Sequence, residues 1–203
     1  MKNYICINGK KAELTEEQLR ALNIGIKEKK LADIAVGETF KVGEHELIVL
    51  EHDNGNTAVL RKDILCKMAF GKSNNDYRKS DVKSYLEKFA KEMTAIIGEE
   101  NLVKHKVDLT SDDGLKDYGE IEELVSLLTA EKYRKYVNII DKYKLDCWWW
   151  LLTPHSTDTH GNSNWVKCVS PRGSVFSNFC SDRSSGVRPF WIFGSSIFVS
   201  CEE

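Results

Sequence analysis

The sequence predicts an α+β protein in which small antiparallel sheets and two main helices hold a long irregular loop region. Two stretches repeat apolar side chains at helical spacing, and short apolar runs elsewhere are separated by turn-forming residues. Residues 145–203 contain only nine charged side chains, but all five tryptophans, five of the eight phenylalanines and eleven serines. The chain therefore divides into a charged, partly helical part and an aromatic, serine-rich part.

The N-terminal third is expected to contain a short helix and then a hairpin. Residues 15–18 read Thr-Glu-Glu-Gln, the form of a capping box, which predicts a helix ending near Ile24. The apolar runs 47–50 and 57–60 flank Asp-Asn-Gly-Asn, and Asn-Gly favours the positive φ angles of a tight β-turn. We expect two antiparallel strands there.

Two longer helices follow. Apolar residues from Ser80 to Gly98 are spaced by three and four positions, with serine as a candidate N-cap and glycine at the C-terminal end. A second helix is predicted from Thr129 to about Lys142, and residues 124–128 are either a strand or an earlier helical turn. Both apolar stripes are expected to pack on a core rather than to bind a partner.

The aromatic part is predicted to form strands linked by turns. Trp148, Trp149 and Trp150 begin an apolar run that we expect to be a strand covered on both sides, because exposed indole rings would leave a large apolar area in water. The segments that follow are a polar loop (153–164), a strand (165–169), a Ser-Pro-Arg-Gly turn (170–173), a returning strand (174–176), an irregular segment (177–185), a return to the core (186–193) and a final strand (196–200).

Composition excludes some classes of function. The formal net charge is −2 and the sequence pI is about 6.2, so there is no overall attraction for nucleic acid. There is neither a secretion signal nor an 18-residue apolar run, and we therefore expect cytoplasmic synthesis and no membrane span. The six cysteines are scattered without a zinc-type spacing, which favours free thiols and no metal. No cofactor is expected.

Three segments resemble a known family. Trp-Trp-Trp-Leu-Leu-Thr-Pro at 148–154, Val-Ser-Pro-Arg-Gly-Ser-Val at 169–175 and Gly-Val-Arg-Pro-Phe at 186–190 are similar to motifs of a largely uncharacterised bacterial and phage domain family. The resemblance extends over about residues 30–200. Leu152 departs from it, because the family often has arginine there, and no role of that charge is carried over.

The resemblance implies a fold and a use. The family is similar to the C-type-lectin-like fold of formylglycine-generating enzymes and of the variable proteins of diversity-generating retroelements. It implies an N-terminal leader strand and short helix (1–30) and a C-type-lectin-like domain (31–203) with a ligand-display region (153–185). The expected protein is a phage or prophage product that binds a protein or glycan on a host cell or another phage protein, and the virion is one expected location.

The residues of the display region support recognition on chemical grounds. Serine, asparagine and glycine supply adaptable hydrogen bonds, while aromatic and arginine side chains are typical anchors of binding surfaces. The candidate ligand-binding residues are Trp165, Lys167, Arg172, Phe176, Asn178, Phe179, Asp182 and Arg183. An ordinary loop with buried aromatic residues is the alternative. Trp148, Trp149, Trp150, Arg188 and Pro189 are expected to be structural, with the Arg188 guanidinium holding loop carbonyls or a carboxylate.

Other functions are less well supported by the sequence. A formylglycine-type oxidase would need a reactive Cys168 or Cys180, yet nothing nearby lowers a thiol pKa. His155, His160 and Asp158 offer an acid–base or metal cluster, and Asp158 with Asn162 and Asn164 offers calcium ligands. We expect a non-catalytic protein. The competing class is an intracellular protein-interaction or host-modulating factor that acts through the charged helices.

Overall fold

The computed structural model describes residues 4–7, 10–13, 15 and 27–201. The described residues form an α+β structure with two α-helices, α2 (Asp81–Ile97) and α3 (Ala130–Ile140), packed on antiparallel sheets, as the sequence predicts. The helix predicted to run from Thr15 to Ile24 lies outside the described residues, apart from Thr15 itself. No helix in the described part of the chain has the length and apolar character needed to cross a bilayer.

The largest sheet has the strand order β10-β14-β6-β5-β4-β15-β3, and β7 also pairs with β14. A second sheet has the order β11-β12-β13, while β1 with β2 and β8 with β9 form two separate hairpins. The strands are β1 (Tyr4–Ile7), β2 (Lys10–Glu13), β3 (Lys27–Lys30), β4 (Thr39–Val42), β5 (His45–Asp53), β6 (Asn56–Arg61), β7 (Leu102–Val103), β8 (His105–Asp108), β9 (Glu120–Glu123), β10 (Val125–Ser126), β11 (Trp149–Pro154), β12 (Trp165–Val169), β13 (Val175–Phe179), β14 (Phe190–Gly194) and β15 (Phe198–Cys201).

Five short 3₁₀-helices join these elements: η1 (Leu31–Asp33), η2 (Tyr77–Lys79), η3 (Glu99–Asn101), η4 (Asp141–Tyr143) and η5 (Asp158–His160). The ends of the main elements follow local chemistry. Asn54 and Gly55 have φ angles of 48° and 77°, which is the turn chemistry predicted for the β5–β6 hairpin. Ser80 caps α2 by accepting a hydrogen bond from the Lys83 amide at 3.0 Å. The ambiguous run 124–128 contains a strand, β10.

The core lies on both faces of the large sheet. Val49 of β5 packs in the cluster that contains α2, whereas its neighbours Ile48 and Leu50 pack in the cluster that contains α3. Successive strand residues point to opposite faces, so α2 and α3 cover opposite sides of the sheet. β11 follows the same rule, with Trp150 in the first cluster and Trp149 in the second. The prediction of a strand covered on both sides is therefore confirmed for these two tryptophans.

Trp148 differs from the prediction. It precedes β11 and 38% of its surface is exposed. Its ring packs at the border of the sheet against Phe176, at 5.4 Å between centroids. The strand begins one residue later than expected, so only the second and third tryptophans of the triplet are buried.

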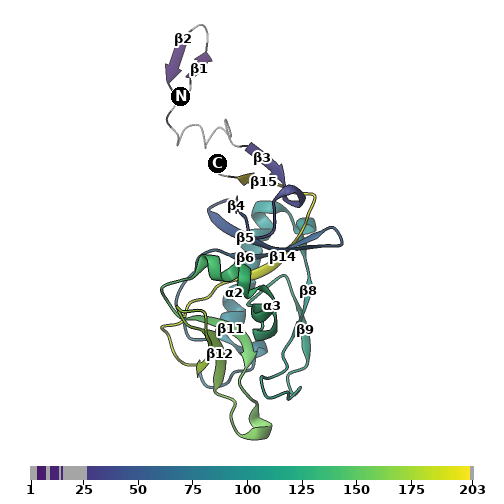
Figure 1. Cartoon of the computed structure of the whole chain (residues 1–203), viewed down its shortest axis with the longest axis vertical. Helices are drawn as coiled ribbons and strands as arrows, with labels where there is room; N and C mark the ends of the chain where they lie inside the picture. The colour runs from purple at the N-terminus through teal and green to yellow at the C-terminus, as the bar shows by residue number, and fades with distance from the viewer. Residues whose placement is uncertain (1–3, 8–9, 14, 16–26, 202–203) are drawn as a thin grey trace.

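The two larger sheets are joined around Gly186 and Arg188. Gly186 forms isolated bridges with both Lys67 and Trp149. The buried Arg188 donates from Nε to the Arg61 carbonyl at 2.9 Å and from Nη2 to the carbonyls of Lys62 and Tyr143 at 2.6 and 3.1 Å. In Figure 1, β3 and β15 lie on the side nearer β1 and β2, and β11 and β12 lie toward the opposite end.

Candidate ligand-binding surface

The β12–β13 hairpin carries the candidate site. Trp165 is opposite Phe179 and Val169 is opposite Val175, so the two strands pair along their whole length. The Gly173 amide donates to the Ser170 carbonyl at 2.9 Å, and a φ of 88° at Gly173 closes the predicted turn. The Tyr133 hydroxyl of α3 donates to the Gly173 carbonyl at 2.7 Å, so the tip of the hairpin is fixed to a helix.

Two aromatic pairs flank β13, and we call Trp148, Trp165, Phe176 and Phe179 the aromatic edge. Trp165 and Phe179 lie with ring centroids 3.9 Å apart, and Trp148 meets Phe176 edge to face. Phe176 and Phe179 remain 51% and 46% exposed. Because they are three residues apart on one strand, their side chains lie on opposite faces of the sheet. Apolar surface is therefore exposed on both sides of the same strand.

The other candidate residues of the hairpin lie around its ends. Arg172 is exposed in the tip turn and Arg183 is exposed beyond β13, and neither forms an ion pair with a residue that the structure describes. Asn178 and Asp182 are half-buried and bind each other, with Nδ2 to Oδ2 at 2.5 Å. Asp182 also accepts hydrogen bonds from Ser184 and Ser185, so it stabilises the turn after β13.

Lys167 is a correction to the candidate list. Only 9% of its surface is exposed, and its Nζ lies 2.9 Å from Asp112 Oδ2. Burial would raise the pKa of Asp112, but the hydrogen bonds and charges of Lys167 and Arg134 lower it overall. The lysine is thus part of an internal ion pair and is not available to a ligand.

The boundary of the irregular segment is also corrected. Residues 177–185 were expected to be irregular, yet Ser177, Asn178 and Phe179 belong to β13. The hydrogen bond from the Cys180 amide to the Asn164 carbonyl at 2.8 Å extends the pairing by one more residue. The exposed phenylalanines therefore occupy fixed positions on a strand.

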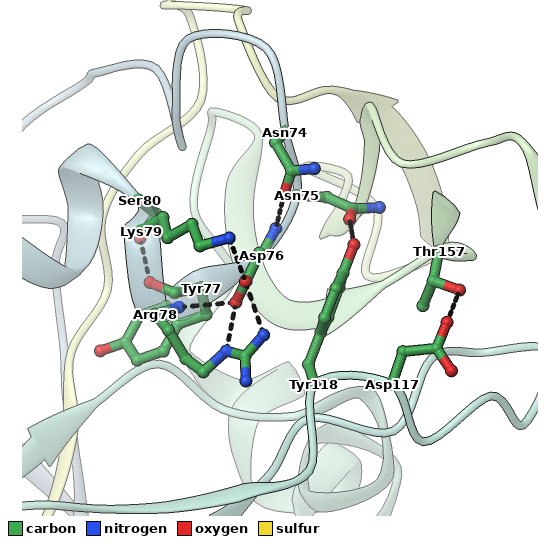
Figure 2. Close-up of polar contacts among 10 residues, drawn as sticks. All are labelled: Asn74, Asn75, Asp76, Tyr77, Arg78, Lys79, Ser80, Asp117, Tyr118 and Thr157. Carbon is green, nitrogen blue, oxygen red and sulfur yellow. Dashed lines mark hydrogen bonds and ion pairs between the residues drawn. The ribbon is translucent and has the colours of Figure 1, made fainter. Parts of the chain in front are cut away.

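The loop before β12, residues 155–164, is held by hydrogen bonds with residues that the sequence does not single out. Figure 2 shows Asn75 and Tyr118 meeting through a 2.9 Å hydrogen bond from the tyrosine hydroxyl to Asn75 Oδ1. The buried Asn75 amide also donates to the carbonyls of Ser156 and Trp165, at 2.9 and 2.8 Å. Asp117 accepts from the Thr157 hydroxyl in the same view. These contacts fix the point where the chain enters β12.

The only signal for Asn75 in the sequence is its place in Asn-Asn-Asp just before the Ser80 cap. That pattern predicts a turn. It does not reveal a contact with Ser156, which is 81 positions away.

The two cysteines of the oxidase alternative are placed unfavourably for reaction. Cys168 and Cys180 are buried, and burial raises both thiol pKa values, that of Cys168 to about 11. His160 Nδ1 lies 2.9 Å from Asp113 Oδ2, whereas Asp158 is exposed. In the described part of the chain, no three His, Cys, Asp or Glu side chains are grouped so that they could hold a metal ion.

The arrangement offers three means of contact with a ligand: apolar ring surface, two guanidinium groups that pair with no described carboxylate, and the main chain of an edge strand. Comparison of the chain with protein-family models, with curated proteins and with solved structures finds no match.

Proposed function

We propose that this chain is a non-catalytic binding module that recognises a protein ligand through the aromatic edge and the adjoining Arg172 and Arg183. The observation that carries the proposal is the exposure of Phe176 and Phe179 on opposite faces of a strand whose position is fixed. Aromatic and arginine side chains are enriched in interface hot spots, and contiguous exposed apolar surface marks interaction sites. Ordinary loop aromatics would be covered by the chain itself.

A protein fits this surface better than a glycan. Sugars bind well on open, flat ring faces, but Trp165 is stacked against Phe179 at 3.9 Å, so one face of each ring is already occupied. The exposed parts of these rings lie beside main-chain groups of β13, which another polypeptide can use. Protein recognition is therefore the form of the proposal that we develop.

The proposal includes the C-type-lectin-like fold and an origin in a phage or prophage, with membership of the bacterial and phage domain family that the three motifs resemble. The proposal is supported by the way the β12–β13 hairpin is held. Main-chain hydrogen bonds and the bond from Tyr133 to Gly173 fix its position. Exposed side chains at positions such as 172, 176, 179 and 183 can change without loss of those bonds. This is what a variable protein of a diversity-generating retroelement requires, on the virion or in the host cytoplasm.

The test compares the phenylalanines of the site with an exposed phenylalanine elsewhere on the protein. Three forms of the full chain are immobilised: the wild type, the double variant Phe176→Ser with Phe179→Ser, and the control Phe198→Ser. Each is used to select peptides from a random library displayed on phage. Phe198 is 61% exposed and lies on β15, away from the hairpin. We expect the wild type and the control to enrich the same peptide motif and the double variant to lose it, with similar melting temperatures for all three proteins.

Enrichment of the same motif by the double variant would show that the ligand binds elsewhere. A glycan array probed with the same proteins tests the other ligand class. If glycans bind in a way that depends on Phe176 and Phe179, and no peptide is enriched, the proposed class of ligand is wrong and the proposed location of the site stands.

A further inference from the structure

β13 is the outer strand of its sheet and has a free side. The sheet order is β11-β12-β13, and the amide of Ser170 donates to the carbonyl of Ser174 at 2.9 Å at one end of the hairpin. Cys180 donates to Asn164 at 2.8 Å at the other end. Hydrogen-bonded and non-hydrogen-bonded pairs alternate in an antiparallel ladder, so Phe176 and Asn178 direct their main-chain groups toward β12. Val175, Ser177 and Phe179 therefore direct theirs outward.

Two of these three residues keep their outward groups unpaired. Phe179 uses its amide for the Asn178 side chain and its carbonyl for the Asp182 amide, both at 2.9 Å. The amides and carbonyls of Val175 and Ser177 bind no described residue outside the hairpin ladder. β13 thus offers two donors and two acceptors in a row.

Proteins usually protect such edges with charged residues, proline or short strands. β3 reads Lys-Glu-Lys-Lys and β9 reads Glu-Ile-Glu-Glu, so these two strands carry charges. The far strand of the same sheet, β11, is covered, because the Leu152 amide donates to the Leu128 carbonyl at 2.8 Å. β13 reads Val-Phe-Ser-Asn-Phe, without charge or proline, and no described strand pairs with its outer side. It lacks the protection given to the others.

We infer that β13 binds its ligand by strand addition: an extended polypeptide segment pairs with Val175 and Ser177 and becomes a fourth strand of this sheet. The inference rests on the proposed function and specifies its ligand. Phe176 on one face and Phe179 on the other would contact alternate side chains of the added strand, which favours apolar or β-branched residues there. Arg172 and Arg183, at the two ends and without ion-pair partners among the described residues, favour acidic residues flanking that segment.

The first experiment uses a synthetic peptide, acetyl-Glu-Glu-Val-Thr-Val-Thr-Val-Glu-Glu-amide, N-methylated on the alternate amides of one edge. That peptide has one pairing edge left, so it can pair with at most one other strand and cannot grow into a longer sheet. Its control is methylated on both edges and keeps the same side chains. We expect the full chain to bind the first peptide and to bind the control at least about tenfold more weakly, because main-chain hydrogen bonds are lost. Replacing the flanking glutamates by lysines should also weaken binding.

The second experiment locates the bonds. Amide hydrogen exchange is followed by NMR with and without the one-edge peptide. The amides of Val175 and Ser177 should exchange at least about tenfold more slowly in the complex, whereas those of Phe176 and Asn178, already paired with β12, should change little. Variants Phe176→Ser and Phe179→Ser should weaken binding, and Phe198→Ser should not.

The possible outcomes distinguish a failure of strand addition from a failure of the proposed function. If library peptides bind through Phe176 and Phe179 without protecting Val175 and Ser177, strand addition is wrong and the proposed function stands. Equal affinity for the two methylated peptides, or no binding of either, also overturns strand addition. Protection of both amides in the free protein, with dimers in sedimentation, would show that the edge pairs with a second copy of the chain.

Discussion

Asp76 illustrates how a buried carboxylate is kept charged. Its side chain is 2% exposed, and both oxygens accept hydrogen bonds of 2.8 Å from the Arg78 guanidinium (Figure 2). Burial acts to raise the pKa of Asp76, but the hydrogen bonds and charge of Arg78, with Lys79 nearby, lower it overall. The carboxylate therefore stabilises the turn that leads into α2 only while it is ionised.

The direction of the pKa shift of Asp76 determines how its contribution to stability depends on pH. Because the pKa of Asp76 is lower in the folded than in the unfolded protein, its contribution is present above about pH 4 and is lost as the pH falls through the folded value. We predict that Asp76→Asn lowers the free energy of unfolding by about 1–3 kcal/mol at pH 7. The difference in the free energy of unfolding between the variant and the wild type should shrink as the pH falls below about 5, as measured by urea unfolding.

Asp81→Asn is the matched control, since Asp81 is an exposed residue in the first turn of the same helix. It should change stability much less. A deficit of Asp76→Asn that stays constant down to pH 3 would show that the ion pair with Arg78 is not its cause.

Single residues also mark where sequence reasoning ends. Lys167 and Arg172 look alike in the sequence, since each is a lone cation among polar and apolar neighbours. Lys167 is buried because Asp112, far away in the chain, lies against β12. Arg172 is exposed because it occupies a turn. Composition predicts the chemistry of a recognition surface, but only the tertiary contacts decide which side chains belong to it.

At the scale of elements, one side chain joins the two ends of the loop of residues 155–164. Asn75 satisfies the carbonyls at both ends of the loop, those of Ser156 and Trp165, and accepts from Tyr118. No other residue type of this size has two donors and one acceptor in this arrangement. The entry into β12, and with it the position of Trp165, is therefore controlled from the segment before α2.

We predict that Asn75→Ala lowers the free energy of unfolding by about 2–4 kcal/mol, because it removes the side-chain donors to the carbonyls of Ser156 and Trp165, of which Trp165 keeps the His155 amide, and the acceptor of the Tyr118 hydroxyl. Tyr118→Phe removes only the hydroxyl and should cost about 1 kcal/mol. Amide exchange in residues 155–164 should accelerate strongly in the first variant and slightly in the second. Equal effects of the two variants on this loop would contradict the role given to Asn75.

Elements differ in how far local sequence defines them. The β5–β6 turn and the ends of α2 depend on neighbours within a few residues, so Asn54-Gly55, Ser80 and Gly98 suffice to predict them. β13 depends on its pairing with β12, and its polar residues 177 and 178 resemble a loop. The α+β class is predictable from such local signals, but the edge strand that carries the candidate site is not.

For the whole molecule, Arg188 links the large sheet to the segment after α3. Its guanidinium joins the end of β6 to the segment after α3 and lies over the Trp149 ring at 5.1 Å. Burial lowers the pKa of Arg188, to about 10, so the group stays charged in neutral solution.

We predict that Arg188→Lys lowers the free energy of unfolding by at least about 3 kcal/mol, because one ammonium cannot reproduce three directed bonds to carbonyls. Arg183→Lys, at an exposed position, should be neutral. Urea unfolding of the two variants measures the difference. A lysine at 188 that matches wild-type stability would mean that the charge alone, and not the planar fork of donors, holds the end of β6 against the segment after α3.

Gly186 has a consequence for how related chains would diverge. A methyl group added there would lie 2.4 Å from Cγ2 of Ile64, which is branched next to its backbone and has little freedom to move. The exposed phenylalanines meet no such restriction. Over evolutionary time the glycine should persist while the rings exchange for other residues, so distant homologues are better identified by the seam between the sheets than by the part of the surface that meets the ligand.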